Sequence, residues 1–300
     1  MSLHGSLVQA SATHCAGHLD TSFVTLGFTK VALLGVVQGI SELLPISSTA
    51  HMRAIPAVLG WPDPGSAFSA AMQLAALAAV VSYFWSDIVA VTKGSVTALA
   101  RQDWADREFG LAVGIVIATI PIGIVGLLLT KLLNQCNSPL RAPMVIGIAC
   151  FVMAFLMGWA ELSAPHKRGA EKLTLLDALL IGLAQVGALV PGFSRSGSTF
   201  TASLGLGFKR EDAARVSFLL GVPAIALAGG RELWLLHQAG LSAYGWQVLG
   251  IGLVVSSLSS YFAIWWLMRF LQKFSTWPLV IYRALFGLVL MVGAEMHWIR

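Results

Sequence analysis

The sequence predicts an all-α polytopic membrane protein, with six transmembrane helices and two re-entrant helical hairpins arranged as two inverted-topology repeats. Three observations support this fold class. Hydrophobic residues make up 57% of the chain, charged residues 11%, and the mean hydropathy is +0.78, which leaves too little polar surface for a soluble globule. Long apolar segments recur along the chain, and two segments half a chain apart carry nearly the same pattern.

Six segments are apolar enough and, at about 20 residues each, long enough to cross the hydrocarbon core of a bilayer. We expect membrane-spanning helices at residues 65–85, 109–133, 142–161, 213–234, 246–268 and 277–297. Two further regions, 26–59 and 173–207, are apolar at both ends and polar in the centre. Because a broken backbone at that depth must be buried in protein or line a polar cavity, these regions predict re-entrant hairpins.

The two hairpin regions read GVVQGISELLPISSTAHM and GLAQVGALVPGFSRSGST. A constant offset, with one single-residue gap before the second proline, pairs Gly35 with Gly182, Gln38 with Gln185, Pro45 with Pro191 and Ser47 with Ser194. We therefore predict one membrane domain, 1–300, with an N-terminal tail at 1–25, a first repeat at 26–161 and a second at 173–298.

The distribution of positive charge supports this plan. Lys and Arg occur in the connections before the second, fourth and sixth spans and between the repeats, whereas residues 1–29, 134–140 and 235–245 contain none. Basic residues concentrate on the cytoplasmic side, and three crossings per repeat would invert the second repeat relative to the first. The basic-free tail also lacks the n-region of a signal peptide. Cys15, Cys136 and Cys150 are scattered and imply neither a disulfide framework nor a zinc site.

Polar residues concentrate in the first hairpin. Gln38 and Glu42 are four residues apart, which places them on one helix face. Pro45 ends that helix, and the next begins with the hydroxyl residues Ser47, Ser48 and Thr49. His51 follows one turn later.

The second hairpin repeats this arrangement with Ser194, Arg195, Ser196 and Thr199 after Pro191. Each returning half-helix would begin inside the membrane with free N–H groups and the positive end of its dipole. Arg195 adds a fork of donors that matches phosphate oxygens, so the favoured ligand is a phosphate-type anion. Since a charge within a membrane costs about 2.5 kcal/mol or more, we interpret Glu42, His51 and Arg195 as functional.

At these residues the chain resembles the undecaprenyl pyrophosphate phosphatase family. The stretches QGISELLPISSTAHM and PGFSRSGST match the two motifs of that family, in the same order. The resemblance extends from about Leu33 to the C-terminus and includes the stretches around Gln73 and Arg283. It implies a multi-pass enzyme of the bacterial inner membrane that hydrolyses undecaprenyl pyrophosphate to the monophosphate carrier of cell-wall synthesis and confers bacitracin resistance. It also implies an active site that opens toward the periplasm and a divalent cation, Mg²⁺ or Ca²⁺.

The resemblance assigns roles to individual positions. It places Glu42 on the family's essential acid, His51 on its histidine, Ser47 and Ser48 on its paired serines, and Ser194, Arg195 and Thr199 on the polar positions of the second motif. From this match and from the residues themselves we expect catalytic roles for Glu42, Ser48, His51 and Arg195, with Glu42 also as metal ligand. We expect substrate binding by Gln38, Ser47, Thr49, Gln73, Ser194, Ser196, Thr199 and Arg283. Gln38 stands where some family members have Glu, so the cation would be held mainly by Glu42 and the pyrophosphate. The expected partners are a polyprenyl pyrophosphate and membrane lipid, with a homodimer possible and no nucleic acid.

Several alternatives remain open at this point. Ser48 or a water molecule could be the nucleophile, and Glu42 or His51 could accept the proton. Gln38 and Gln185 could be interhelical packing contacts, Ser47 and Ser194 could be helix caps, and Arg283 could pair with Glu295. A transporter or flippase for a phosphate-bearing lipid or anion is the alternative function, because inverted repeats with half-helices are transporter architecture.

Overall fold

The computed structural model describes residues 21–129 and 139–297, and within these ranges it is helical without a β-strand. Most of the predicted tail (1–25), most of the predicted turn at 134–140, Cys15 and Cys136 lie outside the described residues. The main helices are α2 (Phe23–Leu43), α3 (Ser48–Val58), α4 (Ser66–Tyr83), α5 (Trp85–Arg101), α6 (Arg107–Leu128), α8 (Pro143–Ser163), α9 (Leu175–Val186), α10 (Arg195–Gly205), α11 (Arg210–Gln238), α12 (Ala243–Lys273) and α13 (Trp277–Glu295). Three short 3₁₀ turns accompany them: η1 (Pro139–Arg141), η2 (Ala170–Lys172) and η3 (Gly187–Leu189).

Six of these helices, α2, α6, α8, α11, α12 and α13, are long and apolar enough to cross a membrane. Five correspond to predicted spans, whereas α2 occupies the N-terminal half of the first region that we interpreted as a re-entrant hairpin. The predicted span at 65–85 is α4, which continues into α5 at a bend of 76°. The connection before the second span, which we expected to be a loop, is mostly the helix α5. It packs against α6, where Ser95 Oγ donates to the Glu108 carbonyl at 3.2 Å.

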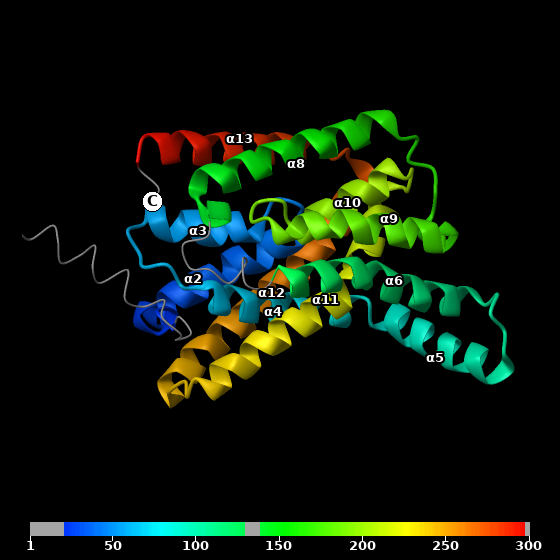
Figure 1. Cartoon of the computed structure of the whole chain (residues 1–300), viewed down its shortest axis with the longest axis horizontal. Helices are drawn as coiled ribbons and strands as arrows, with labels where there is room; N and C mark the ends of the chain where they lie inside the picture. Colours follow the sequence, from blue (N-terminus) through cyan, green and yellow to red (C-terminus); the bar gives the residue numbers. More distant parts are fainter. Residues whose placement is uncertain (1–20, 130–138, 298–300) are drawn as a thin grey trace, which may run out of the picture.

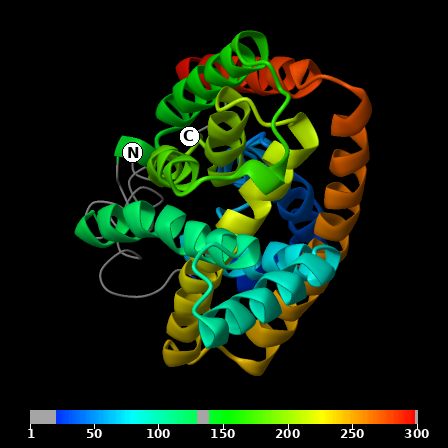
Figure 2. The ribbon, with the colours of Figure 1, turned by 90° about the vertical axis from the view of Figure 1, so that its right-hand side faces the viewer.

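The helices pair along the long axis of the molecule (Figure 1). Helix α8 lies along α13, α2 along α12 and α9 along α6, and α4 packs against both α11 and α12. The short helices α3 and α10 lie between these pairs, and the view along the long axis shows the longer helices arranged around them (Figure 2). The interior of the bundle is therefore where the two short helices begin.

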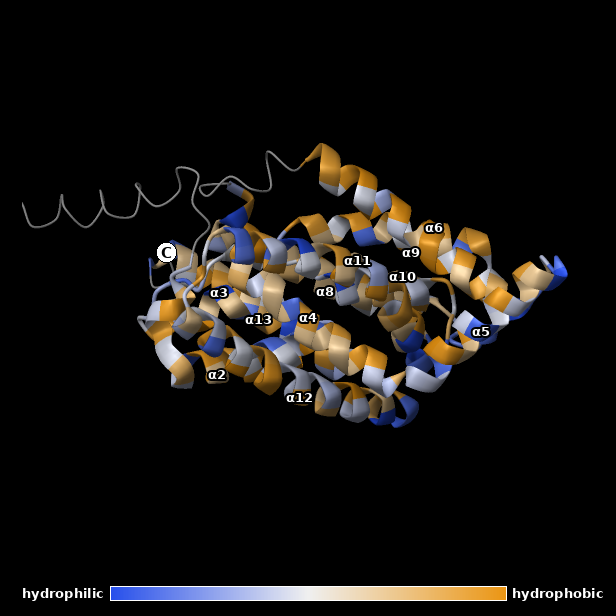
Figure 3. Cartoon of the chain, turned by 90° about the horizontal axis from the view of Figure 1, so that it is seen from below, coloured by the Kyte–Doolittle hydropathy of each residue, from blue (hydrophilic) through white to orange (hydrophobic). Residues whose placement is uncertain are grey.

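Close helix pairing depends on small residues. A Cβ added to Gly147 would lie 2.8 Å from the Gly287 carbonyl oxygen, and one added to Gly287 would lie 2.8 Å from that of Gly147. A Cβ on Gly182 would likewise lie 2.5 Å from the Ala118 carbonyl oxygen. Such contacts let backbones of membrane helices approach closely. The outer surface is apolar along most helices (Figure 3), with Leu127 and Leu128 of α6 more than three-quarters exposed.

Two helix breaks divide this core. Helix α2 ends at Leu43 and α3 begins at Ser48, with Ser47 between them at a φ of 76°. After α9 and η3, α10 begins at Arg195, with Ser194 at a φ of 65°. Positive φ is uncommon for non-glycine residues and costs about 1–3 kcal/mol, so the surrounding contacts must impose this conformation twice.

Candidate active site

The two helix breaks meet at a buried ion pair. Arg195 Nη2 donates to Glu42 Oε1 at 2.5 Å, although the two residues are 153 positions apart in the sequence. The Glu42 side chain is 5% exposed and that of Arg195 14%. Arg195 Nη1 also donates to the Gly221 carbonyl of α11 at 3.1 Å. The guanidinium is therefore held between Glu42 of α2 and the backbone of α11. The predicted convergence of the acid and the arginine is thus present in the structure.

The second oxygen of Glu42 collects two further donors. Gln38 Nε2 donates to Glu42 Oε2 at 2.9 Å, as the four-residue spacing predicted. Ser48 Oγ donates to the same oxygen at 2.5 Å across the break. A carboxylate that accepts the proton of a neighbouring hydroxyl is arranged as a general base for that hydroxyl.

His51 is not bonded to Ser48. Its Nδ1 lies 2.8 Å from the Ser47 carbonyl oxygen, an acceptor, so Nδ1 carries the proton. Nε2 then accepts from the Tyr282 hydroxyl at 2.7 Å, and the ring stacks on Phe286 with centroids 4.1 Å apart. Both ring nitrogens are therefore engaged, and of the two candidate bases only Glu42 reaches Ser48. Sequence reasoning missed Tyr282, whose only signal was its position next to Arg283.

The hydroxyl groups of the second break form hydrogen bonds with other groups of the protein. Ser194 Oγ accepts from the Gly197 N–H at 3.2 Å and so caps α10. Ser196 Oγ donates to the Glu42 carbonyl at 2.9 Å, which ties α10 to the end of α2. Thr199 Oγ1 bonds with Ser217 Oγ of α11 at 2.5 Å. The structure thus brings these three residues to the site, where Ser194 caps α10 and Ser196 and Thr199 bond α10 to neighbouring helices.

The remaining predicted residues divide into three situations. Ser47 is fully buried and its Oγ has no hydrogen-bond partner. Thr49 is exposed at the start of α3, and Gln73 of α4 is half-buried without a hydrogen bond to the site residues above. Arg283 does not pair with Glu295; it is fully buried, and its terminal nitrogens donate to backbone carbonyls of both breaks.

The N-terminus of α3 adds positive potential beside Glu42. Ser48 is the first residue of α3, and within the described structure the N–H groups of Ser48 and Thr49 have no protein acceptor. In α10 the first two N–H groups, those of Arg195 and Ser196, are likewise without a protein acceptor among the described residues, and the third, that of Gly197, is satisfied by Ser194. Free N–H groups and a helix dipole favour an anion, so the start of α3 and the Arg195 guanidinium together form a site for phosphate oxygens.

The residues present do not fit a metal held by the protein alone. No group of three or more His, Cys, Asp or Glu side chains with metal-binding geometry occurs among the described residues. Glu42 is the carboxylate at this site, and its two oxygens already accept from Arg195, Gln38 and Ser48. Mg²⁺ and Ca²⁺ bind sets of oxygen ligands, which this donor set does not supply.

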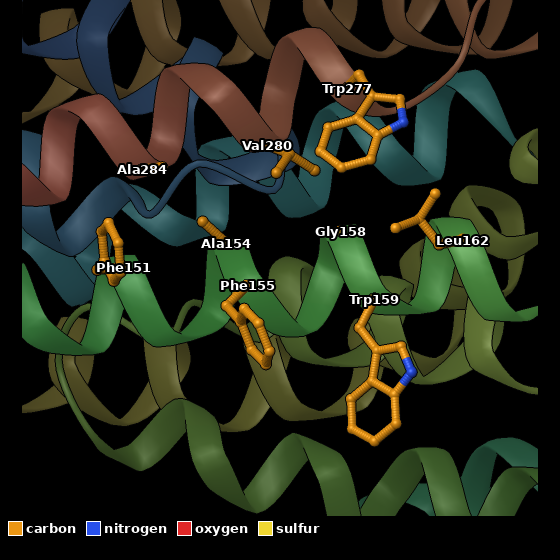
Figure 4. A pocket seen from close by; sticks show the side chains of 9 residues that line it. All are labelled: Phe151, Ala154, Phe155, Gly158, Trp159, Leu162, Trp277, Val280 and Ala284. Carbon is orange, nitrogen blue, oxygen red and sulfur yellow. The ribbon is translucent and has the colours of Figure 1, made fainter.

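An apolar hollow lies elsewhere, between α8 and α13. It has a volume of about 500 Å³ and is lined by Phe151, Ala154, Phe155, Gly158, Trp159, Leu162, Trp277, Val280 and Ala284 (Figure 4). The lining contains no titratable side chain, so this hollow cannot provide acid–base chemistry. The candidate acid, hydroxyl and arginine lie instead at the two helix breaks.

The fold and the site define a polytopic helical membrane protein with a buried centre in which an acid, a hydroxyl and an arginine converge. The chain belongs to the family described as bacitracin resistance protein BacA, whose model matches residues 31–289. It is 64% identical to undecaprenyl-diphosphatase 2 of Mesorhizobium japonicum over 88% of this chain and 100% of that protein. It is 50% identical to the undecaprenyl-diphosphatase of Gloeobacter violaceus (89% of this chain, 91% of that protein) and 48% identical to that of Synechococcus elongatus (89% and 93%).

Proposed function

We propose that this protein is an undecaprenyl-diphosphatase, which hydrolyses undecaprenyl diphosphate to undecaprenyl phosphate and inorganic phosphate. The observation that carries the proposal is the pair of contacts at Glu42, which accepts from the Ser48 hydroxyl through one oxygen and from Arg195 through the other. The relatives named undecaprenyl-diphosphatase align with most of the chain. The product is the carrier lipid of cell-wall synthesis, and removal of the diphosphate would account for bacitracin resistance.

In the proposed mechanism, Arg195 and the N–H groups at the start of α3 bind the terminal phosphate and stabilise the charge on its oxygens during transfer. Ser48 Oγ attacks the terminal phosphorus while its proton passes to Glu42. The bond between that phosphorus and the bridging oxygen breaks, and undecaprenyl phosphate leaves with the proton that Glu42 took from Ser48, which returns Glu42 to its carboxylate form. Water then hydrolyses the phosphoserine, with Glu42 as the base, and inorganic phosphate is released.

A divalent cation would enter with the substrate. Since Glu42 is the carboxylate at this site, we expect the phosphate oxygens to provide most of the ligands and Glu42 the principal protein contact. The cation would supply charge neutralisation on the diphosphate. The hydrogen bonds from Gln38 and Ser48 would keep the Glu42 carboxylate in place with or without the cation.

The same proposal includes a single membrane domain of two inverted repeats with re-entrant hairpins, in the inner membrane with the site toward the periplasm. Helix contacts between the two halves support the repeat. Helix α2 of the first half packs against α12 of the second half, and its counterpart α9 of the second half packs against α6 of the first. Gly35 approaches the Gly252 carbonyl of α12, and its counterpart Gly182 approaches the Ala118 carbonyl of α6. Each half thus packs its broken helix on the other half by the same small residue.

A lipid transporter or flippase is the alternative. It would require binding groups only, whereas Ser48 and Glu42 form a hydrogen-bonded nucleophile and base. The two functions separate in detergent, where no sealed membrane exists. Purified full-length protein should release phosphate from undecaprenyl diphosphate, with and without chelator as separate arms, and Glu42→Gln should not. Binding of the lipid without phosphate release by the wild type would reject the phosphatase.

A further inference from the structure

Arg283 is a buried cation without a carboxylate partner. It lies in the middle of α13, is 0% exposed and makes no ion pair within the described part of the chain. Placing an arginine at membrane depth is costly unless its charge is compensated. Its compensation here comes from backbone carbonyl groups.

Those carbonyl groups belong to both helix breaks. Arg283 Nη1 donates to the Pro45 carbonyl oxygen at 2.6 Å, and Nη2 donates to the Gly192 and Phe193 carbonyl oxygens at 2.6 Å each. These three carbonyl groups lie in loop segments outside the helices, where no backbone N–H of a helix satisfies them. One guanidinium therefore satisfies the carbonyl groups that follow α2 and those that precede α10.

We propose that Arg283 is a positioning residue for the phosphatase reaction: it sets the separation of the two helix breaks and so places Arg195 against Glu42. Pro45 is three residues from both Glu42 and Ser48, and Phe193 is two residues before Arg195. A change in the Arg283 contacts would consequently move the acid, the hydroxyl and the arginine relative to one another. This inference rests on the proposed function and gives Arg283 a role different from the substrate binding that we expected from the sequence.

A glycine in the first turn of α10, Gly197, offers a way to displace the Arg283 guanidinium while its charge is kept. A Cβ on Gly197 would lie 2.4 Å from Arg283 Nη1, a separation that requires one of them to shift. Gly205 on the same helix is a matched control, because a Cβ there would have its nearest neighbour, Ala160 Cβ, at 4.0 Å. Both changes add one methyl group to α10, and only the first meets Arg283.

The test compares Arg283→Lys, Gly197→Ala and Gly205→Ala in purified full-length protein, with steady-state phosphate release from undecaprenyl diphosphate as the readout. A displacement of about 1 Å at reacting groups costs about a hundredfold in rate. We expect kcat to fall about tenfold to a hundredfold for Arg283→Lys and Gly197→Ala, with KM changed less than about threefold and Gly205→Ala close to wild type. Combined with Arg195→Lys, each change should cost less than the product of the single effects, because misplacement of Arg195 is the shared cause.

Three results would overturn the inference. A raised KM with unchanged kcat in Arg283→Lys would make Arg283 a substrate ligand. Wild-type kcat in Gly197→Ala would remove the positioning role even if Arg283→Lys failed to fold. Fully multiplicative effects with Arg195→Lys would mean that the two arginines act independently. Wild-type protein that releases no phosphate would instead reject the proposed function itself.

Discussion

The segments that contain the two breaks, 23–58 and 175–205, share a backbone plan and differ in chemistry. In each, an apolar helix stops near a proline, a serine adopts positive φ, and an 11-residue helix follows. In the first segment the polar positions are an acid, a hydroxyl and an imidazole, whereas the second supplies a guanidinium. The start of α3 carries Ser48 where the start of α10 carries Arg195.

This difference explains why both segments are needed. The first break supplies the base and the nucleophile, and the second supplies the cation for phosphate oxygens. All three groups lie together only where the two breaks meet. The ion pair from Arg195 to Glu42 joins them directly, and Ser196 adds a bond to the Glu42 carbonyl. The repeated backbone supplies two helix ends, and the divergent side chains make them complementary.

The sharpest way to break this comparison is to remove either charge. Arg195→Gln and Glu42→Gln should each lower phosphate release by at least about a hundredfold, because each removes transition-state stabilisation or the base and leaves its partner buried and unpaired. The double variant should be little worse than either single one, since the residues act as a unit. Arg269→Gln is the matched control, because Arg269 stacks on Trp265 away from the site. Near-normal turnover in either single variant would contradict the assignment.

The next effect concerns the nucleophile. Ser48→Ala should reduce phosphate release by about two or more orders of magnitude, and rapid acid quench of wild type should trap phosphoserine. Ser41→Ala on α2 is the control, since Ser41 Oγ donates to the Val37 carbonyl of its own helix. Full activity in Ser48→Ala would instead assign the attack to water activated by Glu42.

A smaller effect separates the two equivalent glutamines. Gln38 Nε2 bonds Glu42, whereas Gln185 Nε2 bonds the Ala118 carbonyl of α6 at 3.3 Å. Gln38→Ala should lower kcat by about tenfold with little change in stability, because it loosens the base. Gln185→Ala should lower stability by about 1 kcal/mol, measured as a lower midpoint of thermal unfolding in detergent, with kcat per folded molecule unchanged. Equal effects on activity would show that the two positions have not diverged.

The smallest effect distinguishes the two serines at positive φ. Ser194 caps α10, so Ser194→Ala should cost about 1 kcal/mol of stability. Ser47 Oγ caps nothing in α3, so Ser47→Ala should leave the unfolding midpoint unchanged. A KM increase in Ser47→Ala would add evidence that its free hydroxyl binds the diphosphate. An equal loss of stability in both variants would contradict the difference in capping.

The sequence by itself determined the membrane class, the positions of the two breaks and the polar residues at them. These properties are local: hydropathy is read within one segment, proline interrupts its own helix, and a four-residue spacing places Gln38 beside Glu42. The tertiary structure alone decided the pairings between distant segments, including Arg195 with Glu42, His51 with Tyr282 and Arg283 with both breaks. Periodicity specifies the helix face on which a side chain lies, but which neighbour occupies that face depends on packing of the whole bundle. For the same reason the helix after Trp85 escaped prediction, because its contacts with α6 and α11 lie outside its own segment.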